Sequence, residues 1–264
     1  MRNNLQVLLS VMDKQDSLHY VDMLNIRTDV LIINQCGYDN EYEHSGRYGN
    51  VYVRESRKRG LSVSRNEALD NARTDRVILC DNDVRYEDDA FERINAAFDR
   101  NPEAGILVFF IERPERHSPV LKKEGPLDRL HSMKIFSPEI AVRRSIIGGL
   151  RFDTEFGSGA RYSMGEENIF LFRAMELGIK TVYVPERIAH LLPQKSEWFT
   201  GYNREFFFNR GAGYEAMDQR LSTLLSLQFL IRKRKLYKDE ISMKDAWESM
   251  MRGRREYRDE HKNG

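Results

Sequence analysis

The sequence has few cysteines, almost no net charge and no long apolar run. Its 264 residues include two cysteines, and 42 basic residues stand against 41 acidic ones, for a formal net charge of +1. A secreted domain stapled by disulfides would carry more cysteines, so we expect Cys36 and Cys80, which lie in or beside apolar runs, to be reduced core thiols. Because there is no basic excess, bulk nucleic-acid binding is not expected.

No stretch approaches the roughly 18 apolar residues that a membrane-spanning helix needs. The apolar stretch near the N-terminus is too short for the hydrophobic region of a signal peptide, and acidic and amide residues follow it. We therefore expect a cytoplasmic protein, with peripheral association at the inner face of the plasma membrane left open. The length fits one large domain, or one domain with a small appendage.

The first half of the chain alternates apolar runs with helical patterns. Helices are predicted near 17–26, 62–72 and 88–98. This alternation predicts an α/β fold, with a parallel sheet covered by helices on its faces. In such sheets ligands bind beyond the carboxyl ends of the strands, so the residues just after each strand matter most. Strands are predicted at 6–11, 30–34, 51–54, 76–80 and 106–111.

The second half is less regular. A charged segment with three prolines suggests a long connection from about 112, followed by a short strand at 133–136. A helix is predicted at 166–177, stopped by Gly178, and a strand at 181–184, ended by Pro185. We expect one domain over 1–200 and a helical extension over 201–264 packed on it. The extension ends in a charged amphipathic helix that packs on the domain or, alternatively, faces a membrane or a partner.

The clearest chemical motif is the run "RVILCDND". Asp81 and Asp83 follow a buried strand at the end where ligands bind. If the strand geometry continues, positions i and i+2 project to the same side, so the two carboxylates need a cation between them. A hard divalent ion, Mg²⁺ or Mn²⁺, suits such oxygen ligands and could hold a diphosphate. The alternative is an ordinary turn, where Asp and Asn are common.

Two helix starts carry further candidates. In "RGLSVSRNEALDNA", Arg59 and Arg65 bracket a helix N-terminus, which favours an anion, and Asn66 could bind a base or a ribose. The alternative there is an ordinary capped amphipathic helix. In "SMGEENIF", Glu166 and Glu167 begin the next helix, where one could act as a general base on an acceptor hydroxyl. The alternative is a capping box, since acidic residues stabilise helix starts.

Five motifs follow one another in an order that resembles a known family. These are "LLSVMDK", "RGLSVSRNEAL", "ILCDNDV", "FGSGARYSMGEENIFLFRAMELGIKTVYVPE" and "WFTGYNREFFFNRGA". Together they resemble the family 2 glycosyltransferases of GT-A fold, especially the bacterial enzymes that build capsular, exopolysaccharide or lipopolysaccharide chains. The resemblance implies a Rossmann-like nucleotide-binding sheet, mixed but mainly parallel, flanked by helices and followed by a C-terminal helical tail.

The resemblance also implies roles for the acidic motifs. Asp83 would coordinate the metal and Asp81 would contact the nucleotide, the metal or both, with Asn82 between them among the nucleotide-contacting residues. "GEEN" stands where the family usually has Gly-Glu-Asp, which implies that Glu167 is the catalytic base and that Glu166 lies beside the acceptor. Because Glu replaces the usual Asp, the choice of base between Glu166 and Glu167 stays open.

Weaker candidates come from the same resemblance. Arg59 and Arg65 would lie near the nucleotide. Ser10, at the end of the first strand, and Asp39, beyond the second, would contact the base or the ribose. His190 would complete the coordination of the ion, with a surface or packing histidine as the alternative.

An aromatic group near residue 200 has two interpretations. Trp198, Phe199 and Tyr202 could stack on the face of a sugar. A core cluster around the C-terminal helices explains them equally well.

The predicted activity is an inverting, metal-dependent transfer of a sugar from a nucleotide diphosphate, with a uridine nucleotide as the commonest choice in the family. The predicted acceptor is a saccharide or a lipid-linked saccharide. Two alternatives are a sugar-1-phosphate nucleotidyltransferase and a binding protein that kept the fold and lost activity. The first would carry a glycine- and arginine-rich loop after the first strand, and "SVMDKQDS" has no glycine there.

Overall fold

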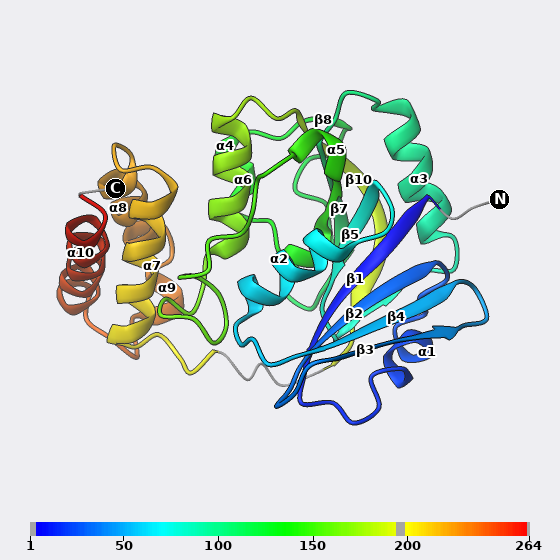
Figure 1. The fold of residues 1–264 in the computed structure, drawn as a ribbon. Coiled ribbons are helices and arrows are strands. Elements are labelled where there is room, and N and C mark those ends of the chain that lie inside the picture. The colour runs from blue at the N-terminus through cyan, green and yellow to red at the C-terminus, as the bar shows by residue number, and fades with distance from the viewer. Residues whose placement is uncertain (1–3, 194–198, 263–264) are drawn as a thin grey trace.

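The computed structural model describes residues 4–193 and 199–262. The strands are β1 (Leu5–Met12), β2 (Asp29–Gln35), β3 (Asn40–Ser45), β4 (Asn50–Ser56), β5 (Arg76–Cys80), β6 (Val84–Tyr86), β7 (Ile106–Glu112), β8 (Gly125–Pro126), β9 (Ile140–Arg143) and β10 (Thr181–Leu191). They form a mixed sheet in the order β3-β4-β2-β1-β5-β9-β7-β10-β6, and β8 pairs with β10 (Figure 1).

The centre of the sheet is parallel and buried on both faces. β1 pairs in parallel with β2 on one side and with β5 on the other, which places Leu9 beside both Ile32 and Cys80. Strands covered on both faces have nearly continuous apolar sequences, as "VLLSV" and "VILC" do here. Because these strands are parallel, the residues that follow β1 and β5 emerge at the same edge.

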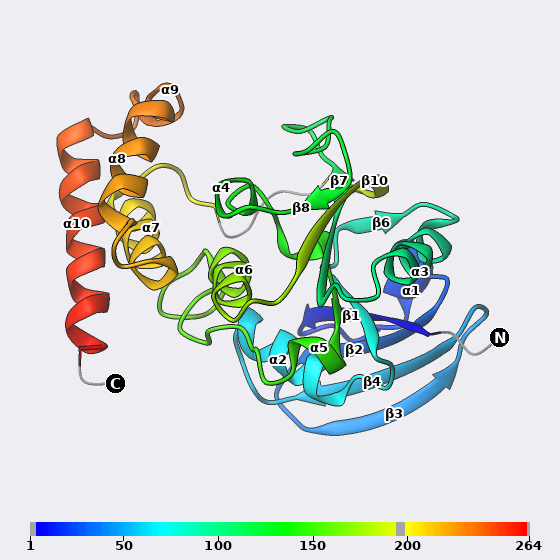
Figure 2. The same ribbon diagram turned by 90° about the horizontal axis from the view of Figure 1, so that it is seen from above.

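Helices cover both faces of this sheet (Figure 2). One apolar cluster joins α3 and the residues after α1 to one face, and a second joins α2 and α6 to the other. Alternate residues of β1 belong to the two clusters, since Val7 and Leu9 lie in the first and Leu8 in the second. The helices of this part are α1 (His19–Met23), α2 (Leu61–Asn71), α3 (Ala90–Arg100), α4 (Arg129–Ser132), η1 (Ser137–Glu139), α5 (Arg144–Ile147) and α6 (Glu166–Glu176).

The C-terminal helices pack beside α6 at the end of the molecule away from β3 and β4 (Figure 2). A third apolar cluster contains Phe156, Tyr162 and Phe172 from the first part of the chain together with Phe207 and Tyr237. Because both parts supply side chains to this cluster, the extension is anchored by a shared core. These helices are α7 (Arg204–Met217), α8 (Ser222–Arg232), α9 (Arg234–Tyr237) and α10 (Met243–Glu260).

Two glycines allow α7 and α10 to cross at backbone contact. A Cβ atom on Gly211 would lie 2.1 Å from the carbonyl oxygen of Met250, and one on Gly253 would lie 2.0 Å from that of Phe208. Both distances are far below van der Waals contact. Any side chain at either position would therefore push the two helices apart.

The predicted fold class is confirmed, as is the reduced state of Cys36 and Cys80, which are both buried and not paired in a disulfide. The predicted strands at 6–11, 30–34, 51–54, 76–80 and 106–111 correspond to β1, β2, β4, β5 and β7. The division at residue 200 remains a proposal. Among the described residues, no helix is both long enough and apolar enough to cross a membrane.

Three local predictions were wrong. The segment 133–136 is not a strand, because α4 ends at Ser132 and the strand that enters the sheet is β9. The strand predicted to end at Pro185 continues to Leu191, because the register between β10 and β7 shifts between Tyr183 and Arg187. At such an irregularity the missing N–H of proline breaks no ladder hydrogen bond. The first helix is also shorter than the predicted 17–26.

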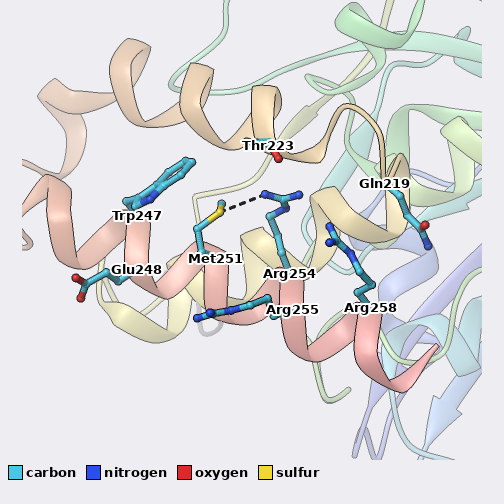
Figure 3. A pocket seen from close by; sticks show the side chains of 8 residues that line it. All are labelled: Gln219, Thr223, Trp247, Glu248, Met251, Arg254, Arg255 and Arg258. Atoms are coloured by element: carbon cyan, nitrogen blue, oxygen red, sulfur yellow. Dashed lines mark hydrogen bonds between the residues drawn. The ribbon is translucent and has the colours of Figure 1, made fainter. Parts of the chain in front are cut away.

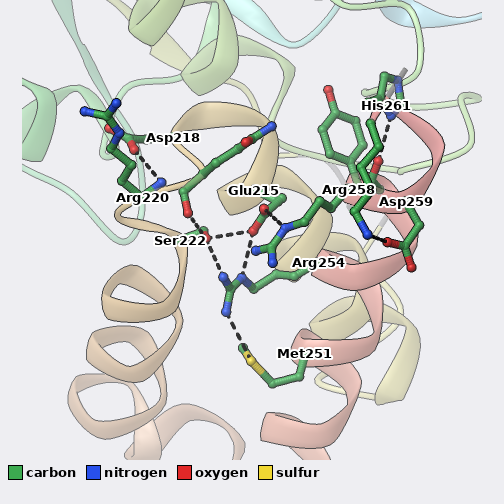
Figure 4. A network of polar contacts seen from close by, with 12 residues as sticks. Glu215, Asp218, Arg220, Ser222, Met251, Arg254, Arg258, Asp259 and His261 are labelled. Atoms are coloured by element: carbon green, nitrogen blue, oxygen red, sulfur yellow. Dashed lines mark hydrogen bonds and ion pairs between the residues drawn. The ribbon is translucent and has the colours of Figure 1, made fainter. Parts of the chain in front are cut away.

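A buried ion-pair network fastens α10 to α7 and α8 (Figure 4). The side chain of Glu215 on α7 is fully buried and accepts hydrogen bonds from Arg254 at 3.0 Å, Arg258 at 2.6 Å and Ser222 at 2.7 Å. Arg254 also donates to Ser222 at 2.6 Å. Although burial acts to raise the pKa of Glu215, the hydrogen bonds from Arg258, Ser222 and Arg254 outweigh it and lower that pKa.

We predict that Glu215→Gln lowers the free energy of unfolding by about 3 kcal/mol, because it leaves the buried Arg254 without its counter-charge. The matched control is Glu248→Gln on α10, whose side chain is 54% exposed and which should change stability by less than about 0.5 kcal/mol. Urea unfolding measures both variants. The contribution of Glu215 is present above its ordinary pKa and is lost as the pH falls through the lowered value. Equal stability of the two variants would contradict the prediction.

Candidate functional site

The polar triplet after β5 forms a turn at the carboxyl edge of the sheet. The buried apolar residues of β5 end at Cys80, and the N–H of Val84 donates to the carbonyl oxygen of Asp81 at 3.4 Å, closing the turn. The N–H of Leu192, just beyond β10, donates to the carbonyl oxygen of Asp83 at 2.7 Å. Asp81, Asn82 and Asp83 are therefore held by two neighbouring segments and remain partly exposed.

A buried arginine joins this turn to the start of α6. The guanidinium of Arg65 on α2 donates to both carboxylate oxygens of Asp81, at 3.0 and 3.3 Å, and to Glu166 at 2.9 Å. Its side chain is 3% exposed. Burial acts to lower the pKa of Arg65, but the carboxylates of Asp81 and Glu166 outweigh that effect and raise it. Two acidic motifs that lie far apart in sequence are thereby brought together.

The start of α6 holds two adjacent carboxylates in different surroundings. Gly165 precedes the helix with a φ of 96°, a conformation that suits glycine. Glu166 is tied to Arg65, whereas Glu167 has no ion pair among the described residues. Burial, together with the neighbouring charge of Glu166, raises the pKa of Glu167 to about 8. Glu167 is therefore a carboxylate with an unusually high affinity for a proton.

Asp83 is a second acidic residue whose negative charge is not balanced by a nearby cation in the described structure. Burial raises the pKa of Asp83 to about 6, and the charge of Asp81 acts in the same direction. Among the described residues, no group of three or more His, Cys, Asp or Glu side chains is arranged to hold a metal ion. Mg²⁺ and Mn²⁺ are commonly bound by one or two carboxylates together with substrate phosphates, so the pair Asp81 and Asp83 fits such an ion.

His190 lies in β10 and is exposed. In the sheet it is opposite Arg85 of β6 and Glu112 of β7, so its strand neighbours the one that begins just after the Asp triplet. The three predicted ligands Asp81, Asp83 and His190 are not gathered into one group. A ligand role for His190 stays a prediction.

The remaining predicted nucleotide contacts are engaged within the protein. Asn66 clasps the backbone of Phe152, donating to its carbonyl oxygen at 2.9 Å and accepting from its N–H at 2.8 Å. The hydroxyl of Ser10 is buried beside β5 and accepts a hydrogen bond from Ser64 at 2.9 Å. Both contacts hold α2 in place, and the nucleotide roles of Asn66 and Ser10 stay predictions.

Arg59 and Asp39 lie on the exposed surface near the ends of β1 and β2. Arg59 donates to both carboxylate oxygens of Asp13 at 2.8 and 2.9 Å and to the carbonyl oxygen of Gln35 at 3.1 Å. Asp39 accepts from the backbone N–H of Arg57 at 2.8 Å. Neither side chain contacts Asp81 or Glu166, and their nucleotide roles stay predictions.

Sequence reasoning missed two arginines just after β7: Arg113, which is buried and interacts with the charge of Glu167, and Arg116, which is partly buried and pairs with Glu139. Arg113 directly follows β7, its side chain is 5% exposed, and its guanidinium lies 3.4 Å from the centre of the Phe136 ring. Burial lowers the pKa of Arg113 to about 10, against the opposing charges of Glu115 and Glu167, and it likewise lowers that of Arg116 to about 10. In both arginines the Nε atom has no hydrogen-bond partner among the described residues.

The sequence signal for these arginines was their position. Arg113 comes immediately after a buried strand, as Asp81 does after β5. The rule that singled out Asp81 would also have found Arg113, but the segment was interpreted as a charged connection.

The described members of the aromatic group, Phe199 and Tyr202, lie just before the C-terminal extension and at its start. Trp198 falls outside the described residues. The rings of Phe199 and Tyr202 are 5.1 Å apart, and that of Tyr202 lies 5.0 Å from Phe206 on α7. These contacts match the core-cluster interpretation, with Phe199 38% exposed at its margin.

A groove of about 510 Å³ lies among α8, α10 and the loop after α7, away from the paired carboxylates (Figure 3). Trp247, Arg254, Arg255 and Arg258 are among its lining residues, and none of the predicted site residues lines it. The single negative charge of Glu215 is shared by Arg254 and Arg258, and Glu248 supplies a second carboxylate at the groove, so most of the positive charge of the three arginines is offset.

We predict that Arg65→Met lowers the free energy of unfolding by about 3 kcal/mol, because Glu166 is left buried without its cation. The control is Arg59→Met, which breaks an equally short pair with Asp13 between side chains that are 47% and 60% exposed, and should cost at most about 1 kcal/mol. Urea unfolding without nucleotide measures both. Losses of the same size would show that Arg65 does not hold the two motifs together.

Known proteins with similar folds bind nucleotide sugars. S. aureus TarS in complex with UDP-GlcNAc matches with a TM-score of 0.64 at 14% identity, over 95% of this chain and 79% of that one. The mannosyltransferase PcManGT from Pyrobaculum calidifontis, in complex with GDP-Man and Mn²⁺, matches with a TM-score of 0.54 at 12% identity, over 96% and 74%. At these identities the likeness concerns the fold alone. No curated protein matches the sequence.

The sequence itself matches the model of one protein family. The match covers residues 16–163, more than half of the chain, and the family is described as glycosyl transferase family 2. This agrees with the predicted activity and not with the alternative of a nucleotidyltransferase. The chain therefore belongs to glycosyl transferase family 2, the glycosyltransferases whose GT-A fold it shares.

Proposed function

We propose that this glycosyltransferase inverts the anomeric centre of the sugar it transfers and depends on a divalent metal, Mn²⁺ or Mg²⁺. The observation that carries the proposal is the buried bridge from Arg65 to Asp81 and Glu166. It joins a carboxylate pair suited to a cation with a second pair suited to accepting a proton. The complex of TarS with UDP-GlcNAc supports a nucleotide-sugar donor, and that of PcManGT with GDP-Man and Mn²⁺ supports the pairing of such a donor with a metal.

A single displacement uses both pairs of carboxylates. The acceptor oxygen forms a bond to the anomeric carbon while the bond from that carbon to the diphosphate oxygen breaks. The electron pair leaves with the diphosphate, and the proton of the hydroxyl passes to Glu167. A metal bound by Asp83, with Asp81 beside it, would supply charge neutralisation for the diphosphate.

The surroundings of the two glutamates favour Glu167 as the base. Glu166 is paired with the buried Arg65, and that contact occupies one of its carboxylate oxygens. Glu167 lacks such a partner among the described residues, and burial raises its pKa to about 8. A base is most effective when its pKa lies near the working pH, because it then combines affinity for the proton with a sizeable ionised fraction.

The structural neighbours support a choice of donor, and the resemblance of the sequence suggests an acceptor. We favour a uridine diphosphate sugar as the donor, as in TarS with UDP-GlcNAc, with a guanosine nucleotide as in PcManGT as the other choice. We propose a saccharide or lipid-linked saccharide acceptor in bacterial cell-surface polysaccharide synthesis. We place this reaction in the cytoplasm, at the inner face of the plasma membrane.

We predict that Glu167→Gln lowers kcat about 10³-fold, because the amide cannot take the proton from the acceptor. The control is Glu176→Gln on the same helix, whose side chain is 49% exposed and which should keep its activity. Release of nucleotide diphosphate from UDP-GlcNAc in the presence of acceptor sugars measures both. In the wild-type enzyme kcat/KM should rise with pH until about 8, since Glu167 is protonated below that pKa.

The pH profile separates a base from a structural residue. If the activity of Glu167→Gln fell but its residual rate kept the same rise with pH, the titrating base would be another group. A near-normal rate in Glu167→Gln would remove Glu167 from the mechanism.

We predict that UDP raises the melting temperature of the wild-type protein when Mn²⁺ is present, and that this rise is largely lost in EDTA and in Asp83→Asn. A ligand that binds only the folded state stabilises it by an amount that grows with the logarithm of its concentration divided by its Kd. The control is Asp89→Asn, an exposed carboxylate before α3, which should respond like the wild type. An equal rise of the melting temperature with UDP in EDTA would refute the dependence of nucleotide binding on a metal. Replacing UDP by GDP tests which nucleobase the enzyme prefers.

A further inference from the structure

Helix α8 is apolar on both of its faces. Its inner face buries Ser222, Leu225, Ser226 and Leu230 against the rest of the extension. On its outer face Leu224 is 61% exposed, Leu227 45% and Ile231 60%. The spacing i, i+3 and i+7 places these three side chains on one stripe.

This arrangement departs from that of an ordinary surface helix. Such a helix has an apolar stripe toward the core and polar residues on the opposite side. Two further large apolar side chains are exposed in the adjoining segments, Leu236 of α9 at 51% and Leu221, just before α8, at 38%. Large apolar side chains gathered on the exposed side of a helix in this way mark a surface that another body covers.

Basic residues flank one end of this stripe. Arg232, Lys233, Lys235 and Lys238 are all exposed, and the sequence from 222 to 238 contains no acidic residue. The nearest acidic residues along the chain are Asp239 and Glu240, and Glu240 accepts a hydrogen bond from the backbone N–H of Tyr202. The stripe is therefore joined to a concentrated positive charge.

We propose that α8 and α9 dock this enzyme on an anionic lipid bilayer. The α8 face, defined as Leu224, Leu227, Ile231 and Leu236 with the four basic residues beside them, matches both parts of such a surface. The apolar side chains enter the boundary between headgroups and acyl chains, and the basic side chains meet the anionic headgroups. α8 and α9 lie at the end of the molecule remote from β3 and β4 (Figure 2).

A second copy of the chain is a poorer match. A twofold contact uses the same patch on both copies, so the basic cluster of one would lie against or near that of the other. Like charges brought together in this way oppose association. A bilayer with anionic headgroups offers the opposite charge next to an apolar layer.

Vesicle flotation of the full chain tests the proposal. The protein should float with vesicles of phosphatidylcholine and phosphatidylglycerol, far less with phosphatidylcholine alone, and less as salt is raised, because salt screens the basic cluster. Leu224→Ser/Ile231→Ser and Lys233→Glu/Lys235→Glu should each lower the bound fraction about tenfold. The matched controls are Leu177→Ser after α6, at 67% exposure, and Lys180→Glu, at 53%, which should bind like the wild type.

The altered side chains are exposed, so the variants should melt like the wild type. A Leu224→Trp variant adds a direct reading, since its fluorescence should shift to the blue only with the anionic vesicles. None of these residues belongs to the proposed active site, so transfer to a soluble acceptor should be unchanged. The proposed transfer reaction and the proposed membrane docking can therefore fail independently of each other.

Three results would overturn the proposal. The first is an absence of binding to the anionic vesicles. The second is equal binding by the α8 variants and their controls. The third is light scattering that shows an oligomer which Leu224→Ser/Ile231→Ser dissociates, because the face would then lie between copies of the chain.

Discussion

The arrangement of the site depends on one buried cation. Arg65 lies between Asp81 and Glu166, residues 16 and 101 positions away in sequence, and fixes their carboxylates. Burying an arginine is costly unless its charge and its donors are matched, and here two carboxylates match them. The same pairing leaves Asp83 and Glu167 as the less compensated member of each acidic motif. We propose that Asp81 and Glu166, held by Arg65, fix the site and that Asp83 and Glu167 beside them carry out the chemistry.

The fold was predictable where burial alone decides the structure. The central strands are buried on both faces, so their apolar runs identify them without tertiary information. The errors arose where the neighbouring strand decides. β3 is polar and exposed along its length and exists because β4 offers an antiparallel edge, while β10 passes through Pro185 because its register shifts there. Neither the strand β3 nor the continuation of β10 can be predicted from the local sequence alone.

The site was predictable as a set of positions more than as a set of contacts. Motif order singled out Asp81, Asp83 and Glu167 as candidates, but it gave no means of knowing which arginine each carboxylate would contact. Arg65 bridges two carboxylates, a contact that the sequence did not predict, and its role at a nucleotide stays a prediction. The exposed apolar stripe of α8 was not predicted either. The sequence shows that the helix has apolar residues on two sides, but it does not show which side the rest of the protein covers.

The crossing of α7 and α10 has a mechanical consequence. Where two helices are separated by side chains, rotamer changes let one roll over the other, but at Gly211 and Gly253 main chain meets main chain and no such cushion exists. The angle between α7 and α10 is therefore fixed at this crossing. The helices it carries keep a constant tilt to the sheet, so any body held by the extension would be presented to the catalytic edge at one fixed angle.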